Sequence, residues 1–329
     1  MMTSNTTYLG ATFVVCLSAA IGCGDDTTAS GTGGSGATGG TITSSGGSGG
    51  VGGTGGQGGS GTGNGGGGSA PLGEHLTYTK SGDLYVARND GSEEQMIRPG
   101  GAGDVTSPVW SPDGSRIAFI ARTDNGSDWG LYVTDPDGGN EQTVLEPTAH
   151  PGIGAPAWFP DGERLAYHFN AGGHNDINVV SVDGTNDETI IGAASNDGAP
   201  AVSPDGATIV YQSDVALWTA NADGTGAQVL VETLPELFTV EPVWAHDGSL
   251  IYFSAGDFEA DIYQVRPDGT ELTQISSASA GEYSPTVSAD GSTLAVYHFG
   301  TPPGVYTVDL ADGAVSLLVE GASEPSYEP

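Results

Sequence analysis

The chain has 329 residues and a formal net charge of −34, because 41 acidic residues stand against only 7 lysines and arginines. From Pro71 to Pro329 the balance is 39 acidic to 7 basic residues. A surface of this sign repels phosphate backbones and anionic lipid headgroups, so we expect no nucleic-acid partner. Solubility alone would explain such acidity, and a basic partner or bound divalent cations would also suit it.

The chain begins with an apolar segment, Tyr8 to Ile21, that is too short to span a bilayer and is followed by small residues. Residues 1–22 are therefore predicted to be a secretion signal. The run Ala20-Ile21-Gly22-Cys23 resembles a bacterial lipoprotein cleavage box, which implies that Cys23 carries the lipid. A plain cleaved signal and an uncleaved anchor are the alternatives. Cys16 would leave with the segment, so we expect no disulfide in the mature chain.

Residues 23–70 follow as a segment made almost entirely of Gly, Ser and Thr between Gly31 and Ser69. No apolar pattern offsets the entropy of ordering it, so we expect a flexible, disordered tether. As a random coil it would span roughly 35 to 40 Å root-mean-square. Residues 71–329 are long enough for one all-β domain with a sizeable core.

Within that domain, a first motif typified by S-P-V-W-S-P-D-G from Ser107 occurs five times. Each copy joins two apolar runs through a turn, which is typical of a β-hairpin. In the turn, proline presets φ, aspartate bonds its own backbone, and glycine supplies a positive φ. The structural turn residues are Asp113, Gly114, Asp161, Gly162, Asp205, Gly206, Asp247, Gly248, Asp290 and Gly291.

A second motif, typified by D-L-Y-V-A-R-N-D-G from Asp83, occurs six times between the copies of the first. It is an apolar strand that ends in Asp-Gly, and a further strand follows each copy. Four strands per repeat, with a period in the forties, predict the blades of a β-propeller.

The two ends of the chain supply the hairpin that the first motif lacks. Glu324 to Pro329 aligns with Ser107 to Pro112, and Gly73 to Tyr78 aligns with Gly114 to Phe119. The C-terminus would then provide the innermost strand of the first blade. The sequence predicts an all-β, six-bladed propeller closed by strand exchange between the two termini, after a disordered Gly-rich linker.

The repeated W-S-P-D-G, I-A-F and L-Y-V-x-x-x-D-G elements resemble the WD40-like repeat of TolB-type β-propellers over Leu72 to Pro329. The resemblance implies a periplasmic envelope protein whose propeller binds a partner lipoprotein. The small α/β domain that precedes the propeller in TolB has no counterpart here, and a lipid signal and glycine tether stand in its place. Similar repeats occur in some peptidases and in oligogalacturonate lyases, so the blades alone do not decide the activity.

We find no catalytic constellation and expect no enzyme and no cofactor. The domain offers no nucleophile elbow for a peptidase. A lyase of the propeller kind would need several histidines in the central channel, but no ligand spacing recurs among the six histidines. Asp124 to Asp128 and Asp257 to Asp261 are the candidate Ca²⁺ loops, although solvated acidic turns would look the same.

Trp110, Trp158 and Trp244 recur at one register of the inner strand, so we expect them to pack between blades. Specificity should lie where the repeats diverge, in the loops 122–129, 150–154, 170–176 and 255–260. The candidate partner-binding residues are Asp124, Asp128, Trp129, His150, His174, Asp257 and Glu259.

The leading hypothesis is a non-enzymatic, monomeric, lipid-anchored propeller of the periplasm, outer membrane or cell surface that binds a protein or peptide. The alternative is a metal-dependent polysaccharide lyase or hydrolase that uses the channel. A third hypothesis is a structural envelope module without a dedicated ligand.

Overall fold

The computed structural model describes residues 73–100, 104–122, 129–147, 152–170, 172–192, 194–232, 238–256, 260–277 and 281–329. The predicted signal segment 1–22, the lipidation site Cys23 and the tether 23–70 lie outside the described residues. Nowhere in the described ranges does a helix form that would be long and apolar enough to cross a membrane.

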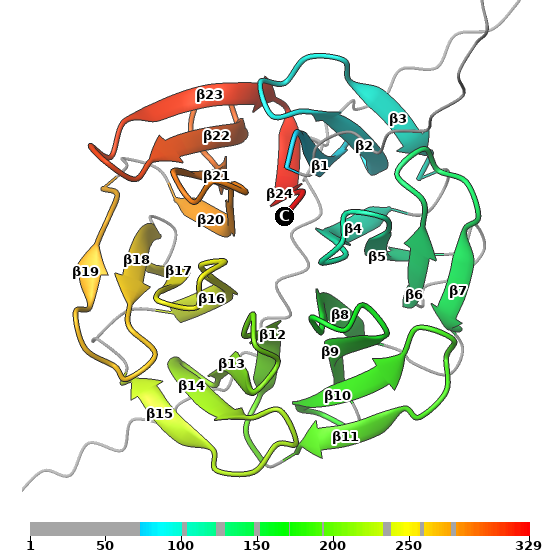
Figure 1. The fold of residues 1–329 in the computed structure, drawn as a ribbon, viewed down its shortest axis with the longest axis vertical. Coiled ribbons are helices and arrows are strands. Elements are labelled where there is room, and N and C mark those ends of the chain that lie inside the picture. The colour runs from blue at the N-terminus through cyan, green and yellow to red at the C-terminus, as the bar shows by residue number, and fades with distance from the viewer. Residues whose placement is uncertain are drawn as a thin grey trace, which may run out of the picture. The chain divides into compact units, whose positions relative to one another are not determined.

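The described residues form six four-stranded antiparallel sheets, arranged as blades around a central axis (Figure 1). Blade 1 comprises β24 (Ala322–Tyr327), β1 (His75–Lys80), β2 (Asp83–Arg88) and β3 (Gln95–Arg98). Blade 2 comprises β4 (Val105–Trp110), β5 (Ile117–Arg122), β6 (Trp129–Thr134) and β7 (Gln142–Leu145). Blade 3 comprises β8 (Ile153–Trp158), β9 (Arg164–Asn170), β10 (Asn175–Ser181) and β11 (Glu188–Ile191).

The remaining blades repeat this order from the inner to the outer strand. Blade 4 comprises β12 (Asp197–Val202), β13 (Thr208–Ser213), β14 (Ala216–Asn221) and β15 (Gln228–Val231). Blade 5 comprises β16 (Phe238–Trp244), β17 (Ile251–Gly256), β18 (Asp261–Val265) and β19 (Thr273–Gln274). Blade 6 comprises β20 (Glu282–Val287), β21 (Thr293–His298), β22 (Gly304–Asp309) and β23 (Val315–Glu320).

The predicted strand exchange is confirmed, because β24 from the C-terminus pairs antiparallel with β1 as the innermost strand of blade 1 (Figure 1). Leu76 lies opposite Tyr327, and Lys80 lies opposite Ala322. Beyond the strand, a carboxylate oxygen of Glu328 accepts hydrogen bonds from the backbone N–H groups of Glu74 and His75 at 3.2 Å. The two ends of the domain are thus fastened by side chains as well as by the ladder.

The core lies between the blades rather than inside any one of them. The described residues form six buried apolar clusters, and each cluster is shared by two neighbouring blades. The tryptophans of the inner strands bridge blades as expected: the indole N–H of Trp158 donates to the carbonyl of Val109 at 3.1 Å, and that of Trp244 to the carbonyl of Ala201 at 3.2 Å.

Because the four strands of each blade run up and down in sequence, their connections lie on two opposite faces of the ring. Because successive strands run antiparallel, both Asp-Gly turns of a blade lie at one end of its strands, which we call the turn face. The loops between second and third strands, and the passages from blade to blade, lie at the opposite end, which we call the connection face. The described residues of the four divergent loops singled out in the sequence all lie at the connection face.

Each inner strand carries a bulge at the residue before its proline. These residues adopt a left-handed φ between 46° and 53°. The strand pairing shifts register here because proline has no N–H to continue the ladder. The bulge residues are Ser107, Ala155, Ala199, Glu241, Ser284 and Glu324. The bulge turns these six residues onto equivalent positions of the inner ring.

Deleting residues 321–329 should destabilise the whole domain, because it removes the inner strand of blade 1 and the buried Tyr327. Losing a large buried side chain alone costs about 3–5 kcal/mol, so the melting temperature should fall by about 10 °C or more. Circular dichroism of the full chain and the truncated chain measures this.

The matched control is Val315→Ser on the exposed outer strand β23, which should stay within about 0.5 kcal/mol of the parent. A truncated chain that melts like this control would show that the seam does not hold the ring.

Candidate functional site

The carboxylates of the turn face are bound to their own turns. Asp205 accepts the hydroxyl of Ser203 at 2.6 Å and the N–H of Ala207 at 2.9 Å. Asp290 accepts the N–H of Ser292 at 3.0 Å. These hydrogen bonds hold the pKa of both carboxyls below its ordinary value. The largest cause for Asp205 is the hydrogen bond from the Ser203 hydroxyl. The largest cause for Asp290 is the hydrogen bond from the Ser292 N–H. Asp113, Asp161 and Asp247 make the same backbone bond.

Two of the candidate partner-binding residues are described, and both lie on the connection face. Trp129 opens β6 and is partly buried, with the Arg122 guanidinium 4.8 Å from its ring centroid. His174 lies in the β9–β10 loop of the next blade, where its Nε2 is 3.6 Å from a carboxylate oxygen of Asp176. The structure assigns the two residues to different blades. Asp124, Asp128, His150, Asp257 and Glu259 lie outside the described residues.

Two glutamates occupy bulge positions of the inner ring, and sequence reasoning did not single them out. Glu324 on β24 accepts the hydroxyl of Thr106 at 2.6 Å and the N–H of Ser107 at 2.9 Å, both on blade 2. Burial raises the pKa of its carboxyl, against these hydrogen bonds. Glu324 therefore ties the exchanged strand to the neighbouring blade from its place on the inner ring.

Glu241 on β16 is the second channel acid, and Ser284 of blade 6 lies between it and Glu324. Its side chain is half-buried, enclosed by the inner strands. Burial raises its pKa to about 7, a hydrogen bond from Ser284 opposes this, and the charge of Glu324 adds to it. The charge of Glu324 therefore reaches the carboxyl of Glu241.

An aromatic group lies beside these acids at the connection-face end of blade 6. The ring centroid of Phe299 lies 4.8 Å from that of Tyr297 and 5.6 Å from that of Tyr283, which it meets edge-on. Phe299 is nevertheless 45% exposed. Burial, and then the charge of Glu324, raises the pKa of Tyr297. Tyr297 thus links the exposed ring to the acidic channel. We call Tyr283, Tyr297, Phe299, Glu241 and Glu324 the channel mouth.

The divergence of the repeats could have revealed the channel mouth. The position of Tyr283 holds Thr106, Gly154, Gly198, Val240 and Ser323 in the other blades. No other copy has an aromatic residue there. The repeats therefore diverge in the inner strands as well as in the loops.

The histidines that sequence analysis weighed as metal ligands are separated. His168 packs against Gly154, where an added Cβ would lie 2.6 Å from the ring. Burial lowers the pKa of His168 to about 4, so its ring is neutral. His298 lies on another blade against Tyr306, with ring centroids 4.6 Å apart. Among the described residues, no group of three or more His, Cys, Asp or Glu is placed to hold a metal ion.

All seven basic side chains lie in the described ranges, and every one has a partner away from the channel. Six of them form ion pairs: Lys80 with Glu94, Arg88 with Glu74 and Glu93, Arg98 with Glu141, Arg122 with Asp104, Arg164 with Asp161, and Arg266 with Glu271. Arg116 donates to the carbonyl of Gly162 and lies over the ring of Trp158. The channel acids therefore have no lysine or arginine partner in this chain.

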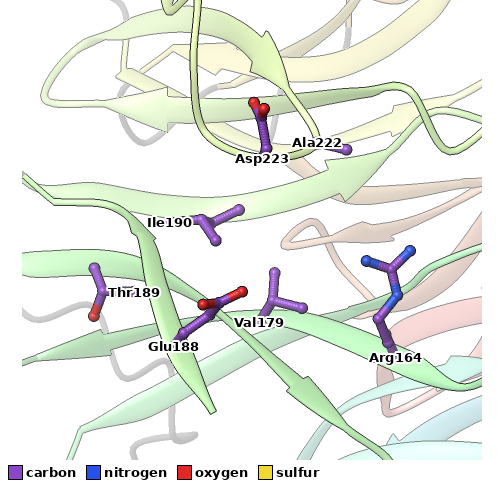
Figure 2. A pocket seen from close by; sticks show the side chains of 7 residues that line it. All are labelled: Arg164, Val179, Glu188, Thr189, Ile190, Ala222 and Asp223. Atoms are coloured by element: carbon purple, nitrogen blue, oxygen red, sulfur yellow. The ribbon is translucent and has the colours of Figure 1, made fainter. Parts of the chain in front are cut away.

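A groove of about 380 Å³ lies at the outer side of blades 3 and 4, away from the channel mouth (Figure 2). Arg164, Glu188 and Asp223 are its charged lining residues. Asp223 accepts the hydroxyl of Thr225 at 2.6 Å, and Arg164 pairs with Asp161 at 2.8 Å. Two of its three charged side chains are thus engaged in local structure, so the groove is a weaker candidate than the channel mouth.

Known proteins that resemble this chain include TolB β-propellers. The family described as TolB beta propeller domain matches residues 73–228. The TolB homolog of Chlorobium luteolum is 26% identical over 151 residues, which make up 44% of this chain and 34% of that protein. The match therefore spans less than two thirds of that relative's length.

Among solved structures, TolB from Acinetobacter baumannii aligns with a TM-score of 0.65 at 16% identity, over 78% of this chain and 67% of that chain. A chain of the Nidogen/Laminin complex aligns with a TM-score of 0.64 at 13% identity, over 78% and 98%. A puromycin hydrolase mutant in complex with PGG aligns with a TM-score of 0.55 at 18% identity, over 76% and 44%. At these identities the likeness is one of fold.

Replacing Glu241 by glutamine should change how stability depends on pH. A carboxyl whose pKa is raised in the folded state binds its proton more tightly there, so its contribution to stability is lost as the pH rises from about 4.5 to about 7. The free energy of unfolding of Glu241→Gln, taken relative to that of the parent, should therefore be about 1–3 kcal/mol higher at pH 8 than at pH 5. Urea unfolding at several pH values measures the difference.

Glu188→Gln, an exposed change on the outer strand β11, is the matched control and should follow the parent at every pH. Parallel pH profiles for Glu241→Gln and the parent would contradict a perturbed channel acid.

Proposed function

Since the described domain is a TolB-type β-propeller, we propose that this protein is a non-enzymatic component of the cell envelope that binds a protein or peptide at the channel mouth. The observation that carries the proposal is the channel mouth itself, where an exposed aromatic ring adjoins two carboxylates that lack a basic partner in the chain. Rings and unpaired charges of this kind are typical of binding hot spots.

The chemistry of the channel mouth favours a segment with a basic side chain. An ammonium or guanidinium group could pair with Glu324 or Glu241 while its stem packs on Phe299 and Tyr297. The acidic surface would also steer a basic partner toward the channel. The propeller of the Nidogen/Laminin complex shows a chain of this fold within a protein assembly, which is consistent with binding of a macromolecule.

No observation favours the alternative of a metal-dependent polysaccharide lyase or hydrolase. That chemistry would need several ligands converging in the channel, and no group of three or more His, Cys, Asp or Glu in the described ranges is placed to hold a metal ion. The puromycin hydrolase shares the fold, and sharing a fold does not establish a shared reaction.

We further propose that the chain is anchored in the envelope by a lipid on Cys23 and that residues 23–70 act as a tether. The motif Ala20-Ile21-Gly22-Cys23 and the Gly-rich composition support both statements. A propeller held in this way could reach a partner at some distance from the membrane.

A photo-crosslinking amino acid at Phe299 of the full chain should capture a discrete partner in living cells. The matched control places the same amino acid at Val229 on the outer strand β15, which is 41% exposed and remote from the channel. We expect a single adduct at Phe299 that decreases as salt is raised. Equal capture at both positions, or none at Phe299, would contradict a binding site at the channel mouth.

Cys23→Ser should abolish incorporation of labelled palmitate and release the protein from the membrane fraction. Cys16→Ser should leave both unchanged, because that residue lies within the predicted signal. Palmitate labelling together with fractionation measures the outcome, and a Cys23→Ser chain that keeps its label would exclude this lipidation site.

A further inference from the structure

Two of the six blade junctions carry a pair of acids at equivalent positions. The first member lies at the start of the third strand of a blade, and the second is the first residue of the inner strand of the next blade. The pairs are Asp176 on β10 with Asp197 on β12, and Asp261 on β18 with Glu282 on β20. Strand β10 lies against β12, and β18 lies against β20.

The other four junctions lack this pairing. The position of Asp197 and Glu282 holds Val105, Ile153, Thr239 and Ala322 in the remaining blades. Of these, Val105, Ile153 and Ala322 are buried apolar residues. A carboxylate at such a position replaces a core side chain and must be stabilised by something other than apolar packing.

Three of the four paired acids are buried between the blades, and the fourth, Asp261, is half-buried. Glu282 is 0%, Asp197 1% and Asp176 8% exposed. Burial raises the pKa of both Asp197 and Glu282, and the charge of the paired aspartate raises it further. The seven lysines and arginines all have partners elsewhere, so none neutralises a pair.

At the junction of blades 5 and 6, a chain of hydrogen bonds through Gln274 and Ser276 connects the two acids. The amide of Gln274 donates to Asp261 at 2.8 Å and to the carbonyl of Ser276 at 2.8 Å. The hydroxyl of Ser276 donates to Oε2 of Glu282. The other oxygen of Glu282, Oε1, is buried and has no hydrogen-bond partner among the described residues.

The junction of blades 3 and 4 repeats this arrangement with different neighbours. Ser195 donates to the carboxylate of Asp197 at 3.0 Å. Oδ1 of Asp176 is buried and makes no hydrogen bond within the described part of the chain, and Nε2 of the His174 ring lies 3.6 Å from it. The charge of Asp214 also reaches Asp197. Each junction thus combines two carboxylates with one buried oxygen left unsatisfied.

A cation bound between the two carboxylates of a pair would balance their charge. A buried carboxylate whose charge is not balanced strongly destabilises the fold. Two carboxylates balance the charge of one divalent ion. Oxygen-only donors of mixed type suit Ca²⁺, which accepts irregular coordination by carboxylates, carbonyls and water, whereas Mg²⁺ demands near-ideal octahedral geometry.

We propose that each of these two junctions binds one Ca²⁺ ion between its paired carboxylates, so that calcium joins blade 3 to blade 4 and blade 5 to blade 6. The site differs from the loops 124–128 and 257–261 expected from the sequence, sharing only Asp261 with them. It also does not depend on binding of a partner at the channel mouth.

Isothermal titration of the full chain with CaCl₂, in physiological salt with excess Mg²⁺, tests the proposal. We expect two saturable sites and a melting temperature that rises with Ca²⁺ and falls with chelator. Asp197→Asn and Glu282→Gln should each lose one site, and the double variant should lose both.

Asp83→Asn is the matched control. Asp83 occupies the same strand position as Asp176 and Asp261 but faces Val105, and its carboxylate accepts the N–H of Gly100 at 2.7 Å. This variant should keep both sites.

The melting temperatures of the apo proteins guard against misfolding as an explanation. In chelator, the double variant should melt at or above the parent, because it lacks the repulsion within each pair; in Ca²⁺ the parent should melt higher. Binding that persists in the double variant would overturn the proposal. So would a parent that binds no Ca²⁺ and gains stability only on acidification, since each pair would then share a proton.

Discussion

The pairing of β24 with β1 is the constraint on which the rest of the ring depends. Every apolar cluster is shared by two blades, so no blade buries its faces unless both of its neighbours are in place. Without β24, blade 1 would lose its inner strand, and the clusters on both sides of it would open. Glu324 extends the effect, because its carboxylate reaches Thr106 and Ser107 of blade 2 from the same strand.

The sequence was sufficient for the blades and their closure, because turn chemistry and alternation repeat in each copy and the two ends complete one another. It was not sufficient for the bulge in each inner strand. The bulge residues with left-handed φ are serine, alanine and glutamate, and these residue types do not predict that conformation. Only the register on both sides of each proline reveals that these residues share one ring.

The site was predicted less well, for a reason that one tripeptide makes clear. Tyr-His-Phe occurs at 167–169 and again at 297–299, but the second copy is shifted by one residue from its Asp-Gly turn. Since side chains alternate across a strand, this shift exchanges their faces. Tyr167 is fully buried between blades 2 and 3, whereas Tyr297 takes the position of His168 and packs against Phe299. Composition could not distinguish the two copies.

Charge unites the interior sites. With 41 acidic and 7 basic residues, the chain engages every lysine and arginine with groups other than the channel and junction acids, six of them in ion pairs. Acids buried in the channel and at two blade junctions therefore have no internal counter-charge. A buried carboxylate must take up a proton or meet a cation from outside the chain. The same scarcity of basic residues that keeps the surface acidic thus makes the interior of the ring responsive to protons, to metal ions and to the basic groups of a partner.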